Sequence, residues 1–255
     1  MRFYHSLILL FLYSFSPASQ AQTCNELHVT GSDKWVPIAY LNKENENQQA
    51  TGIAYDLSRH IAEQLNLPLT LDAKTPWARA MRDLEQGDID LIAGVYSTEE
   101  RKTKFLMSQA FSQDTLNIYV KKGFEFPFQT LDDLIDKRVD VRRRSSNGQA
   151  FDEFAKSQLK PHLINIVDTY EQLFLRLERD RTDYVILDTY TSNQVLYKLG
   201  LEDKITTLKQ PLVTNPIHYI MSKNSPCAKH FKAINDIIQK AKEDGTLDKI
   251  HQVYY

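Results

Sequence analysis

Short apolar runs alternate along the chain with segments in which apolar residues recur every three or four positions. The runs have the length of buried strands, and the periodic segments have the spacing of amphipathic helices. Strands are predicted at residues 27–31, 69–71, 90–95, 138–141, 163–167 and 184–187. Because strands that alternate with helices form βαβ units, the predicted fold class is α/β with mostly parallel sheets.

Residues 75–111 contain the clearest succession of these signals. A predicted helix ends at Gly87, and the apolar run 90–95 follows it. Ser97-Thr-Glu-Glu100 then has the pattern of a capping box, with Arg101 inside the helix that it starts. A buried strand that leads into a helix N-terminus presents backbone N–H groups, and here a guanidinium, to an anion. The stretch therefore predicts a binding site.

The second half of the chain repeats this order of elements. A Leu-Glu pair stands at the same distance before Asp90 and before Asp183, and each Asp opens an apolar strand. Two extended segments, 113–120 and 217–221, connect the halves. We therefore expect two lobes joined by two crossings, with a cleft between them where a small ligand binds. Lobe 1 is predicted to comprise residues 22–115 and 220–255, and lobe 2 residues 116–219.

The first 21 residues are typical of a secretory signal peptide. Arg2 supplies a positive charge, an apolar stretch follows at 7–15, and Ser19-Gln-Ala21 has the small residues of a cleavage site. The apolar stretch is about ten residues long and no later segment approaches ~20 apolar residues, so no membrane span is predicted. We expect cleavage after Ala21 and export of a soluble protein to the periplasm.

The chain has two cysteines, Cys24 and Cys227, and both follow the predicted cleavage site. In an oxidising compartment an even number of cysteines favours a disulfide, which would tie the mature N-terminus to the C-terminal segment. The alternative for Cys24 is a lipid-modified N-terminus. Residues 21–23, however, lack the apolar-then-small pattern expected before such a cysteine.

Charge and motif content exclude several classes of function. Lys and Arg number 31 against 33 Asp and Glu, a net charge of −2, which gives no indication of a nucleic-acid partner. The seven histidines show no metal-ligand spacing. No nucleotide-binding, nucleophile-elbow or zinc-protease motif occurs either. We therefore expect neither a metal or other cofactor nor a catalytic centre.

Several short motifs together resemble a known family, the family 3 periplasmic solute-binding proteins, and they span nearly all the mature chain. These are type II binding proteins that serve polar amino acid ABC importers. The resemblance implies a monomer with the two-lobed type II periplasmic binding protein fold, which closes on its solute by hinge motion and delivers it to a permease in the inner membrane. The motifs are Gly52-Ile-Ala-Tyr-Asp-Leu57, Gly87-Asp-Ile-Asp90, Thr98-Glu-Glu-Arg101 with Ser108, 183–188, and Asp244-Gly-Thr246.

The resemblance also implies roles for particular residues. Arg101 would grip the α-carboxylate of the solute, and Asp188 would bind its α-amino group. Ser145 and Ser146 would add hydrogen bonds, and Trp35 would cover the solute. Two further candidates depart from the family pattern: Tyr96 stands where a small residue is usual, and Arg144 stands where glycine precedes the hydroxyl pair.

Each candidate has a structural alternative. Arg101 is alternatively a solvated residue on an exposed helical turn, and Asp188 only the N-cap of the next helix. Ser145 and Ser146 are equally interpreted as helix caps, and Trp35 and Tyr96 as packed side chains. The run 142–144 is alternatively a solvated charge cluster. Its position before a helix instead favours an anion and predicts a solute more negative than a neutral amino acid.

The sequence thus predicts a periplasmic protein that binds a small polar solute, amino-acid-like or acidic, for an ABC importer. One alternative is a periplasmic enzyme on the same fold, of the cyclohexadienyl dehydratase type, in which Glu99 or Glu100 would serve as the general acid. Another is a sensory receptor without a transporter. The identity of the solute does not follow from the sequence.

Overall fold

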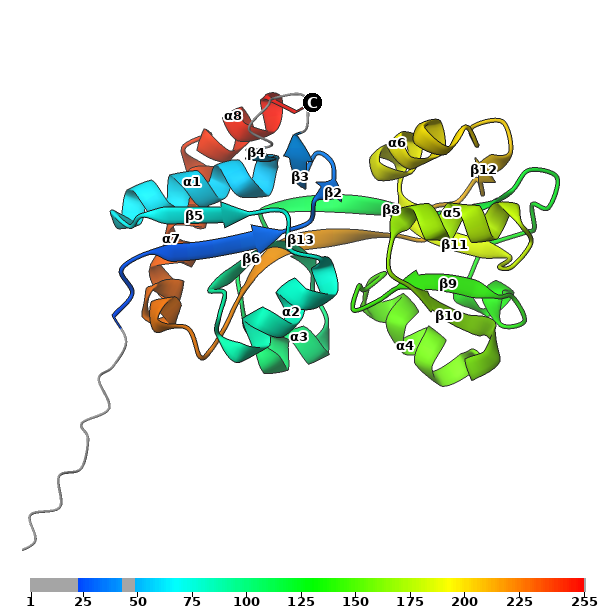
Figure 1. The fold of residues 1–255 in the computed structure, drawn as a ribbon, viewed down its shortest axis with the longest axis horizontal. Helices are drawn as coiled ribbons and strands as arrows, with labels where there is room; N and C mark the ends of the chain where they lie inside the picture. The colour runs from blue at the N-terminus through cyan, green and yellow to red at the C-terminus, as the bar shows by residue number, and fades with distance from the viewer. Residues whose placement is uncertain (1–22, 43–48, 255) are drawn as a thin grey trace, which may run out of the picture.

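The structure, a computed structural model, describes residues 23–42 and 49–254. The predicted signal peptide lies outside these residues. Within them the chain forms two lobes, each with strands flanked by helices (Figure 1). The α/β fold class predicted from the sequence is confirmed. The residue boundaries assigned to the two lobes remain a prediction.

Lobe 1 contains the N-terminal elements and the last two helices of the chain. Its main strands and helices are β1 (Leu27–Gly31), α1 (Ile53–Leu65), β5 (Leu69–Asp72), α2 (Trp77–Gln86), β6 (Leu91–Tyr96), α3 (Glu99–Lys104), β7 (Leu106–Met107), α7 (Phe231–Glu243) and α8 (Thr246–Gln252). A small separate sheet consists of β2 (Lys34–Trp35), β3 (Ala39–Asn42) and β4 (Gln49–Thr51). The small sheet was not predicted, because strands of two to four residues are too short to show a period of two.

Lobe 2 has the same alternation of strands and helices. Its elements are β9 (Val139–Arg142), α4 (Gln149–Gln158), β10 (Ile164–Val167), α5 (Tyr170–Glu178), β11 (Tyr184–Asp188), α6 (Thr189–Leu199) and β12 (Ile205–Thr207). Short 3₁₀ turns occur at Leu131–Leu134, Pro161–Leu163 and Pro226–His230, the last of them in lobe 1.

Two long strands, β8 (Ser112–Lys121) and β13 (Val213–Met221), run from one lobe to the other (Figure 1). They pair with each other in antiparallel register and join the parallel strands of both lobes into one sheet, in the order β10-β9-β11-β8-β13-β6-β1-β5. Strand β1 is parallel to β5 and β6, and β9 is parallel to β10 and β11. The two crossings predicted from the sequence are therefore neighbouring strands.

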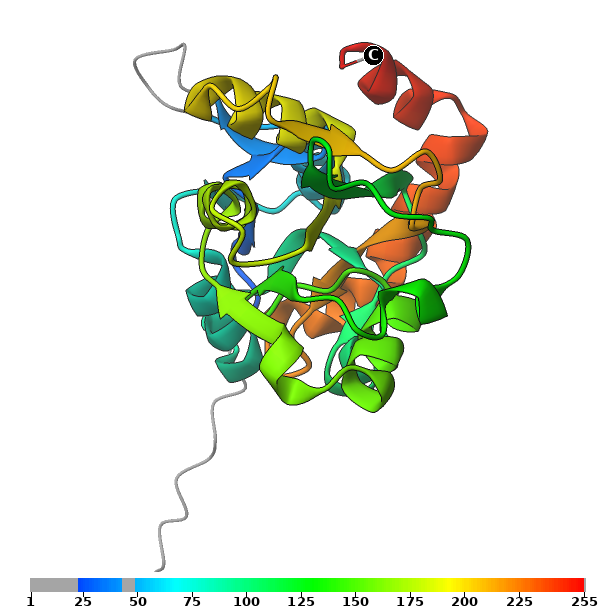
Figure 2. The same cartoon turned by 90° about the vertical axis from the view of Figure 1, so that its right-hand side faces the viewer.

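The alternation of side chains along β11 explains how lobe 2 is layered. Tyr184 and Ile186 belong to the apolar cluster that contains the phenylalanines of α4. Val185 and Leu187 belong to the cluster formed with α5 and α6. Successive residues of a strand point to opposite faces, so the helices cover both faces of the sheet. Figure 2 shows α5 and α6 on one side of these strands and α4 on the other.

The predicted start of α3 needs a correction. Thr98, not Ser97, is the N-cap, and its hydroxyl accepts a hydrogen bond from the backbone N–H of Arg101 at 3.1 Å. Glu100 does not close a capping box but pairs with Lys104 one turn later. The shift by one residue makes Arg101 the third residue of the helix, so its side chain emerges next to the end of β6.

The N-terminal and C-terminal segments of the described chain both belong to lobe 1. Cys24 and Cys227 form the predicted disulfide in the core of this lobe. Helix α1 packs against both α7 and α8, so the C-terminal segment covers one face of the N-terminal elements. Within the described ranges no helix is both long and apolar enough to cross a bilayer, and no three His, Cys, Asp or Glu side chains form a group that could hold a metal ion.

Candidate functional site

A cavity of about 70 Å³ lies between the lobes, at the carboxyl ends of β6, β9 and β11. In open α/β sheets, ligands usually bind in a crevice outside these strand ends. Every residue predicted to contact the solute lines the cavity except Arg144. The wall includes Trp35, Trp77, Tyr96 and Arg101 from lobe 1 and Arg142, Ser145, Ser146, Tyr170 and Asp188 from lobe 2.

Arg101 is a buried side chain, with an exposed fraction of 7%. The alternative of a solvated surface arginine therefore does not hold. Its Nη1 donates to the backbone carbonyl of Tyr96 at 2.8 Å, which fixes the guanidinium at the end of β6. No carboxylate among the described residues lies within 4.0 Å of its guanidinium nitrogens. Burial lowers the pKa of Arg101 to about 10, so the group is cationic at neutral pH.

Asp188, on the opposite lobe, ends β11 and caps α6. Its Oδ1 accepts a hydrogen bond from the backbone N–H of Thr191 at 2.7 Å, so Asp188 is the N-cap of α6, as the structural alternative predicted. This role does not exclude contact with a solute. The side chain is 4% exposed, lines the cavity and has no cationic side chain within 4.0 Å in the described part of the chain. Burial, together with the nearby Asp114 carboxylate, raises the pKa of Asp188 to about 7.

Asp114 is a partly buried acid that the sequence analysis missed. Its Oδ2 accepts hydrogen bonds from the Tyr96 hydroxyl at 2.6 Å and from Trp35 Nε1 at 3.0 Å. Burial raises the pKa of Asp114, and these two hydrogen bonds oppose the rise. Asp114 does not itself line the cavity. A single aspartate near the start of a long strand carries no periodic signal, so the pattern of the sequence could not have singled it out.

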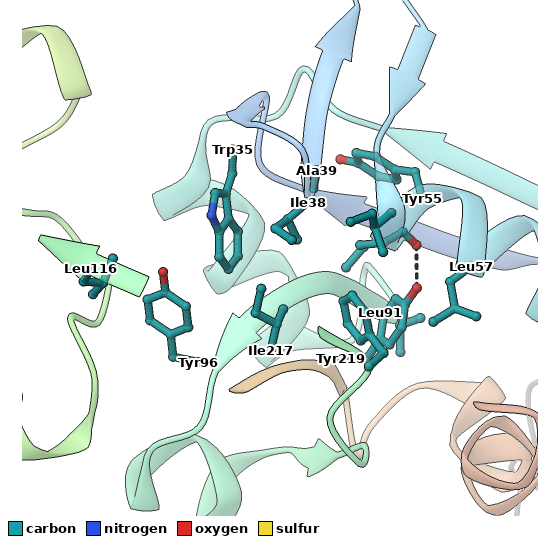
Figure 3. Close-up of a cluster of buried hydrophobic side chains, with 14 of the residues drawn as sticks. Trp35, Ile38, Ala39, Tyr55, Leu57, Leu91, Tyr96, Leu116, Ile217 and Tyr219 are labelled. Atoms are coloured by element: carbon teal, nitrogen blue, oxygen red, sulfur yellow. Dashed lines mark hydrogen bonds between the residues drawn. The ribbon is translucent and has the colours of Figure 1, made fainter. Parts of the chain in front are cut away.

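Trp35 and Tyr96 are packed side chains that also line the cavity; their contact with a solute remains a prediction. Their rings meet edge to face with centroids 5.2 Å apart, and both rings line the cavity. Figure 3 shows them with Leu116 at one end of the buried cluster. Gly94 allows this approach, because a β-carbon there would lie 3.2 Å from the Trp35 ring. Gly94 is the extra residue of a β-bulge in β6, because the consecutive residues His218 and Tyr219 of β13 pair with Val95 and Ala93. Its φ is 99°, a conformation that glycine adopts readily.

The loop after β9 holds the predicted hydroxyl pair. The Ser146 hydroxyl donates to the Asp152 carboxylate and accepts from the backbone N–H of Gly148 at 3.0 Å. Ser146 therefore orders its own loop, but it does not cap α4, whose N-cap is Gly148 without a side-chain cap hydrogen bond. Ser145 is exposed at the cavity wall, and its backbone N–H donates to the carbonyl of Arg142 at 3.1 Å.

The arginines of this loop point in different directions. Arg144 has φ of 58°, and its carbonyl accepts a hydrogen bond from Trp77 Nε1 at 3.1 Å across the cleft. The Arg144 side chain lies 3.5 Å from the Glu85 carboxylate and outside the cavity wall. Arg142 lines the cavity instead, with its guanidinium carbon 4.4 Å from the centre of the Tyr170 ring.

Further contacts hold the lobes against each other around the cavity. Lys34 Nζ lies 2.8 Å from Glu171 Oε1, and the Thr191 hydroxyl donates to the carbonyl of Lys34 at 3.3 Å. On another side of the cleft, the backbone N–H of Glu99 donates to Gln149 Oε1 at 3.0 Å. These contacts, made by side chains from both lobes, describe a closed arrangement of the cleft.

Known proteins similar to this chain are mostly binding proteins. A probable amino-acid-binding protein, YxeM of Bacillus subtilis, is 25% identical over 93% of this chain and 87% of its own length. The L-cystine-binding protein TcyJ of Escherichia coli is 22% identical over 83% and 77%, respectively. Enzymes also occur: the chain is 24% identical to membrane-bound lytic murein transglycosylase F of Histophilus somni, but it spans only 44% of that protein.

Solved structures show the same fold. An ancestral arginine-binding protein bound to arginine superposes with a TM-score of 0.73 at 24% identity, covering 92% of this chain and all of the other (100%). A histidine kinase sensor domain similar to periplasmic binding proteins reaches 0.75 at 15% identity, covering 90% and 95%. An ancestral amino-acid-binding protein described as a precursor of cyclohexadienyl dehydratase reaches 0.67 at 23% identity, covering 91% and 95%.

The family assignment rests on the length of the match. Residues 27–255, which include every strand and helix described above, match the family named bacterial extracellular solute-binding proteins, family 3. The resemblance seen in the sequence motifs is confirmed by this match. The chain belongs to the bacterial extracellular solute-binding proteins of family 3.

Proposed function

We propose that this protein captures a small amino-acid-like solute in the cavity between its lobes and delivers it to an ABC permease in the inner membrane. One observation carries the proposal. A buried guanidinium on lobe 1, Arg101, and a buried carboxylate on lobe 2, Asp188, line the same cavity, and neither has an oppositely charged side chain within 4.0 Å in the described part of the chain. A zwitterion supplies both missing partners.

The position of the two charges links binding to closure. The α-carboxylate of the solute would bind Arg101, and its ammonium group would bind Asp188 on the facing lobe, so one molecule bridges the cleft. Closing the cleft removes water and strengthens both charge pairs. Affinity then depends on how far these contacts exceed the intrinsic cost of closure. The permease would recognise the closed form, and the protein would act as a monomer in the periplasm after loss of residues 1–21.

The solute is best identified by screening. The relatives and structural neighbours bind amino acids, L-cystine or arginine, so the screen should contain neutral, acidic and basic amino acids together with L-cystine. A ligand at 100 times its Kd stabilises the folded state by about 2.7 kcal/mol, which a thermal-shift assay detects. Hits are then titrated by calorimetry. If no compound with an α-amino acid group binds, the proposal is wrong.

Asp188 also favours a second candidate function, a dehydratase. A carboxyl group with a pKa of about 7 is suited to general acid catalysis. The residues first considered for that role fit less well, because Glu99 and Glu100 are exposed, pair with Lys102 and Lys104, and do not line the cavity. Incubation with prephenate or arogenate, followed by product chromatography, tests this candidate. Steady product formation that is lost in Asp188→Asn would favour the enzyme over the binding protein.

A further inference from the structure

The charged groups in the cavity wall do not balance for a neutral amino acid. Four charged side chains line it: Arg101, Arg142, Asp140 and Asp188. Asp140 forms an ion pair with Arg176 behind the wall, so its charge is already matched. The other three have no oppositely charged side chain within 4.0 Å among the described residues. The carboxylate and ammonium groups of a neutral zwitterion would pair with Arg101 and Asp188, and the guanidinium of Arg142 would still have no charge partner.

The guanidinium left over is that of Arg142, which lies between two aromatic rings in the wall. Its carbon lies 4.4 Å from the ring centre of Tyr170 on lobe 2 and 5.9 Å from that of Trp77 on lobe 1. Both rings lie within the distance at which an aromatic face attracts a cation. Arg142 Nε is nevertheless a buried donor for which residues 23–42 and 49–254 supply no hydrogen-bond acceptor. A buried donor of this kind costs free energy until an acceptor is supplied.

We infer that Arg142 selects the side chain of the solute, and that the preferred solute carries a second carboxylate in addition to its α-amino acid group. The inference rests on the proposed function, because it assigns the α-carboxylate to Arg101 and the ammonium group to Asp188. The second carboxylate accepts the free Nε–H and occupies the fork of the guanidinium, a geometry in which arginine binds carboxylates strongly. Acidic amino acids have this chemistry.

Stacking alone does not account for Arg142. Aromatic faces attract the cation but accept no conventional hydrogen bond from Nε–H, which remains without an acceptor. The neighbouring Arg143 shows the contrast, because its Nε donates to Asp168 Oδ1 at 2.7 Å on the surface. Among the residues that the structure describes, a carboxylate thus pairs with the arginine that faces solvent and none pairs with the arginine that faces the cavity. Asp114, a partly buried acid nearby, already accepts hydrogen bonds from Tyr96 and Trp35 and lies outside the wall.

The test is calorimetry with matched pairs of solutes. L-glutamate is compared with L-glutamine and L-aspartate with L-asparagine, since each amide keeps the shape of the acid but lacks its side-chain charge. L-arginine, whose side chain is cationic, is the control of opposite charge. Arg142→Gln removes the charge and keeps most of the stem, and Arg142→Lys keeps the charge without the fork. Arg143→Gln makes the same charge change at the adjacent exposed position. Circular dichroism and thermal unfolding verify that each variant is folded.

The wild-type protein is expected to bind one acid at least tenfold more tightly than its amide, the order of the effect of one good charged contact. Arg142→Gln should weaken binding of that acid on the order of 100-fold and change binding of the amide little, because a buried charge partner is lost. Arg142→Lys should restore part of the preference, and Arg143→Gln should leave it unchanged.

Other outcomes separate this inference from the proposed function. If an amide or L-arginine binds as tightly as the acids, the inference is overturned while the proposed function stands. The same holds if Arg142→Gln weakens acid and amide equally, because Arg142 would then support the cavity without selecting the side chain. If none of the five amino acids binds to the wild-type protein, the inference fails; the assignment of Arg101 and Asp188 fails with it only if the wider screen also finds no ligand with an α-amino acid group.

Discussion

Replacing Asp188 by asparagine tests the electrostatics of the empty cavity directly. Asparagine keeps an oxygen that can accept the hydrogen bond from the N–H of Thr191, which is 2.7 Å away from the carboxylate, and it is a good N-cap residue. The substitution therefore removes a buried charge and preserves the start of α6. In the ligand-free protein we expect this variant to be more stable than the wild type at pH 8 and about equally stable at pH 4.

The magnitude follows from the perturbed pKa. A rise from 3.8 to about 7 corresponds to on the order of 4 kcal/mol of unfavourable charge burial. Between these two pH values the folded wild type holds a proton that the unfolded chain has lost. Its stability therefore falls as pH rises through this window and is constant above about pH 7. The asparagine side chain of the variant has no proton to lose, so the difference between the two proteins should grow from near zero toward this value.

The assay is urea unfolding followed by circular dichroism, at several pH values from 4 to 8, for ligand-free protein. Asp132→Asn, a substitution at an exposed acid, serves as control. Subtracting the free energy of unfolding of the variant from that of the wild type at each pH cancels the contributions of most other titrating groups. The exceptions are the groups that interact with Asp188, which are Asp114, Tyr96, Tyr119 and Tyr170. A difference between wild type and Asp188→Asn that does not change with pH would refute the reasoning.

Three further predictions concern binding and stability. Arg101→Ala should weaken solute binding by on the order of 2–5 kcal/mol in calorimetry, the cost of losing a buried charge partner, whereas the exposed Lys102→Ala should not; equal losses would argue against a direct role. Breaking the disulfide by Cys24→Ser with Cys227→Ser should lower the free energy of unfolding by about 2–5 kcal/mol, and an unchanged denaturation midpoint would contradict its structural role. Glu171→Gln removes the carboxylate that pairs with Lys34 across the cleft, so it should speed solute dissociation in stopped-flow measurements; an unchanged rate would place the closing contacts elsewhere.

The sequence predicted best those elements whose local signals agree with their tertiary surroundings. Helix α6 begins and ends where its cap Asp188 and Gly200 indicate, because both caps satisfy backbone groups that the helix leaves unpaired. All six residues of β6 are buried, as its apolar run suggests. The N-cap of α3 was placed one residue early, since Ser97 and Thr98 are both good caps and only tertiary packing decides between them.

The site was predicted less completely than the fold. Asp188 directly follows a predicted strand and Arg101 lies in the first turn of the helix after another, where position alone indicates a role. For the arginine run, the sequence analysis favoured Arg144, but Arg142 shares one face of β9 with Asp140, and both line the cavity. The period of two along that strand was a usable signal. Which way Arg144 turns could not be predicted, because it depends on a left-handed backbone conformation and on Glu85 in the other lobe.

The position of β13 in the sheet has a consequence for the order of folding. This strand lies between β8 and β6, yet it starts only at Val213, so β6 has an unpaired apolar edge until nearly the whole chain has been made. Helices α7 and α8, which cover α1, come later still. The strands and helices of lobe 2, in contrast, are continuous in sequence. Contacts between distant segments form slowly. We therefore expect lobe 1, whose first segment precedes lobe 2 in the chain, to finish folding last, which leaves its sheet edge open to aggregation for longer than that of lobe 2.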